Sequence, residues 1–359
     1  VPLFSVVVFA AASPQVTYVS KMMNPADEIV SPDMYDGRRR RRNYLIGGAA
    51  AVVVLIIVIS VSVSLSRRSS SISSNEIEDI RAMIKNAMDK EGLDASVLDQ
   101  SGTYQSTSFD WLVGNVEIRD YDRSQILQRF SLGAIYYSTN RIASIYSPNP
   151  QGWLNAQGWM TNEHECGWQG ISCNEGLKVN GIDLGENGLT GKVPPELVLI
   201  REHLEYLDLT TNELFMKESD GDFEFFEKMS DLQTLLMDDN YLESDDGIPK
   251  NFAAMVNIEK IRLSYNLFAG QLDNYLFTQW TKLTHLEMES NFLTGTLPEA
   301  VGELTDLVYL YVRRNSLEIN LDFIKTGKLN NLFAMWLDSN KLTGSIPTEI
   351  GQLTFLASL

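Results

Sequence analysis

The sequence is poor in cysteine, histidine and basic residues, and each shortage excludes a class of protein. Its 359 residues include two cysteines and three histidines, which excludes a cysteine-rich scaffold and leaves little for a metal cage. One disulfide and two free thiols both stay open at this point. There are 29 Lys and Arg residues against 47 Asp and Glu residues, so the net charge is −18. A chain this acidic repels phosphate backbones, and we expect no nucleic-acid binding.

Catalytic motifs are also missing. The sequence has no phosphate-binding glycine loop, no nucleophile elbow and no set of kinase signatures. Its acidic pairs, at 238–239 and 245–246, fall on expected strand ends or loops, where solvation is the ordinary explanation. We therefore expect no enzymatic activity, no cofactor and no metal ion.

Residues 45–65 form a long hydrophobic run with no charge over 21 residues. As a helix at about 1.5 Å per residue the run reaches about 30 Å, the thickness of a bilayer core. A buried strand is the alternative, because part of the run alternates, but 21 residues are too many for a strand. Five arginines at 38–42 precede it and two follow, so the positive-inside rule predicts a cytosolic N-terminus and an extracellular or lumenal remainder. A signal peptide at 1–15 is a rival interpretation, although that run lacks a basic start.

The rest of the chain divides around this single transmembrane helix. We expect a disordered cytosolic segment at 1–43, a flexible stalk at 66–75, a helical lead-in with a cap at 76–178, and repeats at 179–359. The charge follows the same division, with +2 up to residue 66 and near −20 beyond it. An exported acidic body on a basic cytosolic tail is the predicted arrangement.

The lead-in shows helical periodicity in two segments, 76–92 and 124–140. Residues 108–114 are predicted to form a shorter helix between them. The first helix is expected to pack on the next domain, with partner binding or self-association as the alternative. The residues predicted to be buried are Ile77, Ile80, Ile84 and Ala87 or Met88 in the first helix, and Ile126, Leu127, Phe130, Leu132 and Ile135 in 124–140.

A phrase of the form LxxLxLxxN recurs through the second half of the chain. Its first, fourth and sixth positions are apolar and are predicted to form a continuous core. The asparagine should turn inward and bond the backbone of its own and neighbouring units. The asparagines lie 24–28 residues apart, at Asn187, Asn212, Asn240, Asn266, Asn291, Asn315 and Asn340. Seven units and a truncated eighth are expected, and the unfinished unit together with the initial Val suggests that both ends are fragment boundaries.

This period and phrase resemble the leucine-rich repeat. The motif Leu-Thr-Gly-x-(Ile/Leu/Val)-Pro at 189–194, 293–298 and 342–347 is similar to the plant type of that repeat. The resemblance implies an α/β fold, a right-handed horseshoe solenoid with a helical N-terminal cap. The longer unit at 204–231 carries an acidic insertion that is expected to bulge outward. The insertion does not match a calcium loop, because Phe225 stands where that motif needs glycine.

The segment WMTNEHECGWQGISC, residues 159–173, resembles the cap that precedes plant-type repeats. The resemblance implies a disulfide between Cys166 and Cys173, as expected of an exported domain. A metal site built from His164 and the two cysteines is the alternative, but it is one ligand short.

Residues between and just after the core leucines should line the concave face of the solenoid in columns. The late units place several aromatic and arginine side chains in these columns, and such side chains are enriched at binding hot spots. The predicted ligand contacts are Arg262, Tyr265, Tyr309, Tyr311, Arg313, Arg314 and Trp336. The alternative is that an eighth unit covers part of this cluster.

The sequence therefore predicts a membrane-anchored, receptor-like binding module that faces the extracellular space or a lumen. Its expected partner is a protein or peptide on the concave face, with a co-receptor as a further partner. The absence of Asn-x-Ser/Thr sites favours protein contact over a glycosylated coat. Two alternatives stay open: a structural or adhesion protein of the surface, and the ectodomain fragment of a receptor-like kinase. Because the span precedes the repeats, a kinase beyond residue 359 would need a second span.

Overall fold

A computed structural model describes residues 72–115, 117–140 and 152–359. The predicted transmembrane helix at 45–65 and cytosolic segment at 1–43 lie outside the described residues, as does most of the predicted stalk. Within the part of the chain that is described, no helix is both long enough and apolar enough to cross a bilayer.

The described chain begins with a helical lead-in, as the periodicity predicts. Its first helix starts with a capping box, in which the Ser73 side chain accepts from the backbone N–H of Glu76 and the Glu76 carboxylate accepts in return. Asp122 caps the longest of the following helices in a similar way. The elements are α2 (Ser74–Lys90), η1 (Ala95–Asp99), α3 (Tyr104–Val113), η2 (Ile118–Asp120) and α4 (Arg123–Thr139).

Helix α4 is buried on more sides than an amphipathic helix would be. The predicted core residues of α4 are buried except Leu127, which is half-buried beside a cavity of about 380 Å³. Gln128 and Arg129 are buried as well. The reason is that α4 packs against α3 on one side and against the first repeat on the other. In α2, Ile84, Ala87 and Met88 are buried, while Ile77 and Ile80 are half-buried.

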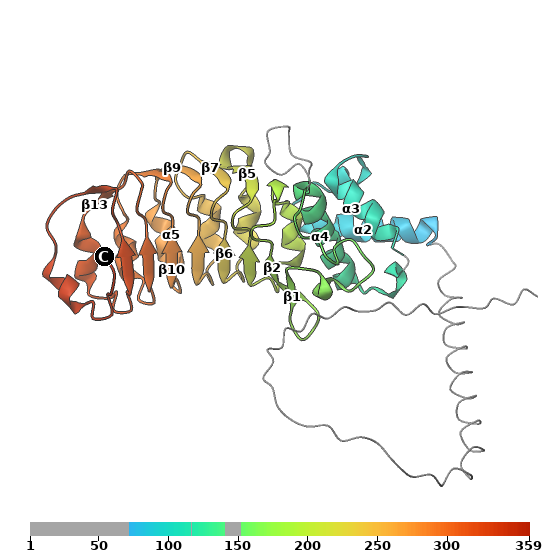
Figure 1. Cartoon of the computed structure of the whole chain (residues 1–359). Helices are drawn as coiled ribbons and strands as arrows, with labels where there is room; N and C mark the ends of the chain where they lie inside the picture. The colour runs from blue at the N-terminus through green and yellow to red at the C-terminus, as the bar shows by residue number, and fades with distance from the viewer. Residues whose placement is uncertain (1–71, 116, 141–151) are drawn as a thin grey trace, which may run out of the picture. The chain divides into compact units, whose positions relative to one another are not determined.

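The repeats stack their core strands into one eight-stranded sheet (Figure 1). Strand β1 pairs antiparallel with β2, and every later pair is parallel. The strands are β1 (Ile171–Cys173), β2 (Val179–Asp183), β4 (Tyr206–Asp208), β6 (Thr234–Leu236), β8 (Lys260–Arg262), β10 (His285–Glu287), β12 (Tyr309–Tyr311) and β14 (Ala334–Trp336). This parallel stack with N-terminal helices confirms the predicted leucine-rich-repeat solenoid, whereas its handedness and horseshoe curvature stay predictions.

A second set of short strands follows the asparagines, and the repeated phrase does not predict it. These strands form a five-stranded sheet, β11-β9-β7-β5-β3, and a two-stranded sheet, β13-β15. They are β3 (Thr190–Gly191), β5 (Glu213–Lys217), β7 (Tyr241–Ser244), β9 (Leu267–Gln271), β11 (Phe292–Thr294), β13 (Glu318–Ile319) and β15 (Lys341–Leu342). The chain then returns through short helical turns: η4 (Pro195–Ile200), η5 (Glu218–Asp220), η6 (Glu224–Lys228), η7 (Lys250–Ala254), α5 (Asn274–Gln279), η8 (Glu299–Glu303), η9 (Leu321–Thr326) and η10 (Thr348–Gln352).

The asparagines form a hydrogen-bonded ladder between the main sheet and the second set of strands. In the fourth unit, the Asn266 amide donates to the carbonyl of Met237 in the preceding unit at 2.9 Å and to two carbonyls of its own turn. Its side-chain oxygen accepts from the N–H of Leu242 at 3.0 Å. The same bonds recur from Asn212 to Asn340. Asn187 begins the ladder and bonds the cap instead, through the backbone of Asn155.

Substituting Asn266 by Ala is expected to lower the free energy of unfolding by about 1–3 kcal/mol, because buried backbone groups lose their partner. Urea unfolding measures the loss. Asn340→Ala is the matched control, since that side chain makes the same bonds at a partly exposed end of the ladder. An equal loss in the two variants would contradict the idea that burial sets the cost.

The insertion in the second unit packs into the core, which differs from the predicted outward bulge. Phe223, Phe225 and Phe226 are buried, and the rings of Phe225 and Phe226 stack with centroids 4.3 Å apart. Two acidic residues of the insertion form ion pairs within the protein: Lys192 Nζ lies 3.2 Å from Asp220 and 2.8 Å from Asp222. The insertion therefore fills the longer coil with aromatic side chains.

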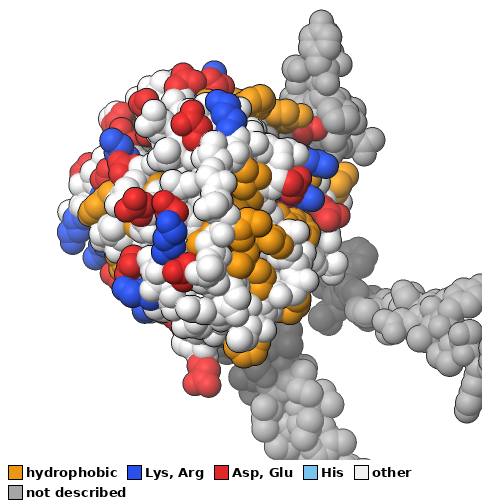
Figure 2. Space-filling model, turned by 90° about the vertical axis from the view of Figure 1, so that its left-hand side faces the viewer, with side chains coloured by type: hydrophobic (Ala, Val, Ile, Leu, Met, Phe, Trp, Pro, Cys, Tyr) orange, Lys and Arg blue, Asp and Glu red, His pale blue; other side chains and the backbone are white. Residues whose placement is uncertain are grey.

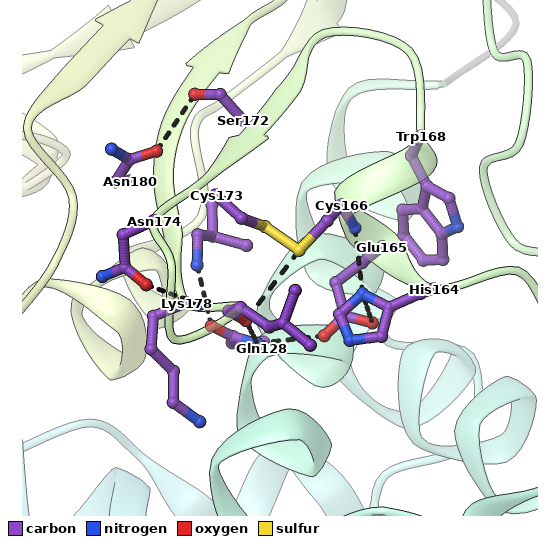
Figure 3. The surroundings of a disulfide bond; sticks show 12 residues. Gln128, His164, Glu165, Cys166, Trp168, Ser172, Cys173, Asn174, Lys178 and Asn180 are labelled. Carbon is purple, nitrogen blue, oxygen red and sulfur yellow. Dashed lines mark hydrogen bonds and ion pairs between the residues drawn. A yellow bond between two sulfur atoms is a disulfide. The ribbon is translucent and has the colours of Figure 1, made fainter.

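The cap is closed by a disulfide between Cys166 and Cys173, whose Cα atoms are 5.6 Å apart (Figure 3). His164 accepts the backbone N–H of Cys166 through Nδ1 at 3.2 Å, which gives it a local structural role beside the turn η3 (Glu165–Gly167). Gln128 of α4 donates to Glu165 and accepts from the N–H of Val179, so it joins the cap to the first parallel strand. Among the described residues no group of three or more side chains could hold a metal ion.

Candidate functional site

The concave columns predicted from the sequence lie in register along the main sheet. One column pairs Asp183 with Asp208, continues through Leu236, and brings Arg262 beside Glu287. The same column ends with Tyr311 opposite Trp336. Because parallel strands lie about 4.8 Å apart, side chains in such a column form one continuous surface.

Aromatic rings from three neighbouring strands form a platform at the late end of this face. Tyr311 and Trp336 stack with centroids 4.1 Å apart and planes inclined by 15°. Tyr309 lies 5.8 Å from Tyr311 and 4.6 Å from the imidazole of His285. Phe333, 45% exposed, packs on Tyr309 at 5.9 Å. We call these five side chains the aromatic platform.

The two arginines of the columns are neutralised within the face. Arg262 Nε lies 2.8 Å from Asp238 and 3.3 Å from Glu287. Arg313 Nε lies 2.5 Å from Glu289, and its guanidinium covers the Trp336 ring at 4.5 Å. Neither arginine is therefore a free cation for an anionic ligand, and Arg313 instead extends the flat surface of the platform.

The structure brings some of the predicted contacts together and separates others. Tyr309, Tyr311, Arg313 and Trp336 form one cluster, whereas Arg262 lies on β8, two strands before β12. Tyr265 and Arg314 occupy the turn before the asparagine, where the seven equivalent residues all have φ between 52° and 58°. These two exposed side chains lie at the edge of the sheet rather than in its columns.

His285 and Phe333 were not predicted to belong to the site. His285 occupies the first position of β10, opposite Tyr309, and Phe333 directly precedes β14. The two columns predicted from the sequence start at the last residue of each strand. They therefore do not include the first residue of a strand or the residue before it. A ring at the same offset as Tyr309 is a signal that finds His285, whereas Phe333 lies one position before that offset.

Burial shifts the titration of several groups on this face. Burial raises the pKa of Asp238 to about 6, although Arg262 and the N–H of Ser264 oppose the shift. Burial likewise raises the pKa of Glu287, and it lowers the pKa of His285 to about 4, helped by Lys260 and Arg262. The imidazole is therefore neutral at pH 7 and acts as an aromatic ring.

Asp238 should make stability depend on pH between about 4 and 6. Because its folded-state pKa lies above that of an unfolded Asp, the folded protein takes up the proton first as the pH falls. The free energy of unfolding contributed by Asp238 therefore rises as the pH falls through 6, by at most about 1.4 kcal/mol per pH unit. His285 acts in the opposite sense, since its pKa is lowered.

Urea unfolding of the wild type and of Asp238→Asn from pH 4 to 7 isolates this contribution. The difference between the two proteins should change across pH 4–6 and be constant near pH 7. Parallel pH profiles for the two proteins would rule out a titration of Asp238 in this range.

Two further surfaces lie apart from the concave face. A cavity of about 550 Å³ lies where the end of α2 meets the first two repeats, with Glu91, Lys192 and Phe225 in its lining.

The second surface is the C-terminal end of the stack. Figure 2 shows hydrophobic side chains gathered on this end, which faces left in Figure 1. Exposed apolar residues of the last coil include Leu342, Ile346 and Phe355. Next to them the first residues of the eighth unit pair with β14, and Ser358 accepts from Trp336 Nε1 at 3.0 Å.

Comparisons with known proteins agree with this architecture. The family model of the Leucine Rich Repeat matches residues 282–304. Phytosulfokine receptor 1 of Arabidopsis thaliana is 30% identical over 186 residues, which cover 45% of this chain and 17% of the receptor. The receptor-like protein kinase BRI1-like 3 of the same plant is 28% identical over 151 residues, covering 42% and 12%. The crystal structure of PEPR1-AtPEP1 superimposes with a TM-score of 0.52 at 26% identity, over 64% of this chain and 30% of that one.

The chain thus spans less than a fifth of the length of these two curated relatives. The repeated phrase, the stacked parallel strands, the asparagine ladder and these matches agree with one another. The chain carries leucine-rich repeats of the plant type and is similar in this part to plant receptor-like kinases and receptor-like proteins.

Proposed function

We propose that the protein is a membrane-anchored, receptor-like binding module that recognises a protein or peptide on the concave face of its main sheet. The aromatic platform with Arg313 carries the proposal, because aromatic and arginine side chains dominate binding hot spots. Phe333 is exposed, and the other platform residues and Arg313 are half-buried. The relatives support it by name, since one is a phytosulfokine receptor and the superimposed structure contains PEPR1 with AtPEP1.

The proposal places the repeats outside the cytosol. The hydrophobic run at 45–65 with its preceding arginines supplies the anchor and its orientation. The disulfide of the cap supports an oxidising compartment. Protease treatment of sealed vesicles tests the orientation: residues 76–359 should be protected in vesicles whose cytosolic side faces outward. Digestion of that part from the cytosolic side would overturn the placement.

The binding test uses the full chain in lipid nanodiscs and a library of random ten-residue peptides. Peptides selected on the wild type should bind Trp336→Ala and Tyr311→Ala at least tenfold more weakly, because each substitution removes half of the stacked pair. Tyr275→Ala is the control, since that side chain is 57% exposed on the return helix α5. Unchanged binding by both platform variants would refute recognition at the concave face.

A further inference from the structure

We infer that the ligand is an extended peptide with a basic residue near one end and an aromatic or large apolar residue near the other. Its basic end lies over β2 and β4, and its apolar end lies on the aromatic platform. This inference rests on the proposed function and adds the chemistry and the orientation of the ligand. It depends on the uneven distribution of charge along the concave face.

The early end of the face carries two carboxylates without a cation. Asp183 and Asp208 are directly opposite each other in the sheet. The carboxylate of Asp208 accepts from Tyr206 Oη at 3.1 Å and from the N–H of Thr210 at 2.9 Å. Within the described ranges, no Lys or Arg forms an ion pair with either aspartate. Like charges that face each other across two strands repel, and a bound cation relieves that repulsion.

The pKa of the neighbouring Tyr206 responds to the charges of these two aspartates. Burial raises the pKa of Tyr206 to about 12, and the charges of Asp208 and Asp183 add to the shift. Arg262 opposes it, but this arginine is already paired with Asp238 of the preceding unit and Glu287 of the next. Among the described residues, β2 and β4 therefore present negative charge that no ion pair offsets.

The late end of the face offers a flat surface with little net charge. Arg313 is paired with Glu289 and stacks on Trp336, so it contributes area rather than free positive charge. Tyr311 and Trp336 present their stacked rings beside it. Such a surface suits an aromatic or large apolar side chain, which gains by losing contact with water and by ring packing.

The distance between the two ends sets the length of the peptide. Five strand-to-strand steps separate β4 from β14. At about 4.8 Å per step they span about 24 Å, which an extended chain at about 3.3 Å per residue crosses in seven or eight residues. Between the ends lie the ion pairs of Arg262, whose polar atoms can contact a peptide backbone. A ten-residue peptide is therefore long enough to reach both ends.

The library of random ten-residue peptides, applied to the full chain in nanodiscs, tests this inference directly. Selected sequences should be enriched in Lys or Arg near one end and in aromatic residues six to eight positions away. The double variant Asp183→Asn/Asp208→Asn should bind the basic peptides at least tenfold more weakly. Raising the salt concentration should weaken peptide binding to the wild type, and it should have much less effect on binding to this double variant. Trp336→Ala should instead remove the preference for aromatic residues and keep the salt dependence.

The matched control is Asp245→Asn/Asp246→Asn, which removes the same charge from two exposed residues after β7. Equal weakening by both double variants would show that only the overall negative charge acts, and would overturn the inference. Selected peptides that need Trp336 but contain no basic residue would also overturn it, while leaving the proposed function in place. Failure to select any peptide, or selected peptides insensitive to every concave variant, would reject the inference and the proposed function together.

Discussion

Substituting Arg129 by Leu is expected to lower the free energy of unfolding by about 3–5 kcal/mol, the usual cost of removing one partner from a buried ion pair. The side chains of Arg129 and Glu165 are both fully buried, with Nη1 of the arginine 3.2 Å from the carboxylate. The guanidinium also donates to the carbonyls of Thr161 and Glu163. It therefore holds α4 and two turns of the cap in one hydrogen-bonded unit.

The rings around Arg129 raise the expected cost. Its guanidinium lies about 5 Å from the ring centroids of Trp111, Tyr121 and Trp168. Leucine keeps part of this packing but leaves the Glu165 carboxylate buried without its cation. Loss of the cap would expose the first coil of the stack, whose stability depends on a covered end.

Two variants separate the ion pair from the general effect of losing an arginine. Arg119→Leu removes an arginine that pairs with Glu76 at the surface, and it should cost much less because water screens an exposed ion pair. The double variant Arg129→Leu/Glu165→Leu should recover part of the loss, because the stranded charge is gone. Urea unfolding followed by tryptophan fluorescence measures all three. If Arg129→Leu costs no more than Arg119→Leu, the buried pair does not hold the cap.

The repeat stack could be predicted from the sequence because one spacing determines it. Each asparagine from Asn212 to Asn340 bonds the turn of its neighbour, so a constant period of the phrase implies a constant register of the strands. The order of the concave columns follows from that register, which is why the spacing alone predicts Tyr311 beside Trp336. The helices of the lead-in were also predictable, because apolar residues that recur at helical spacing indicate a buried helix face.

The missed features depend on contacts between residues far apart in the chain. Arg129 lies on a helix predicted to be amphipathic, and a local pattern assigns an arginine to the solvent side. Its partners, at 161–165, lie more than thirty residues later. The neutralisation of Arg313 by Glu289 is a contact between successive units, which the composition of a single unit does not reveal. The second set of strands was overlooked because each is only two to five residues long, too short for a periodic pattern to stand out in the sequence.

The insertion of the second unit yields the other large prediction: Phe226→Ala should lower the free energy of unfolding by about 3–5 kcal/mol, as is usual for removing a buried phenyl ring. Phe226 is fully buried, and its ring lies 4.3 Å from Phe225 and 4.6 Å from Phe252 of the next unit. Alanine leaves a cavity between two coils, because the rings of Phe225 and Phe252 lose the ring that packs between them.

Phe215→Ala is the matched control, because Phe215 belongs to the same unit but is 45% exposed on β5. Its loss should change the free energy of unfolding by less than about 1 kcal/mol. Urea unfolding of both variants decides between two roles for the insertion. Similar small changes would mean that the insertion is a surface loop, as its acidic sequence indicates. A large change confined to Phe226→Ala would mean that the insertion completes the core of its coil. Its aromatic side chains would then do in this longer coil what the apolar residues of the return segment do in the shorter ones.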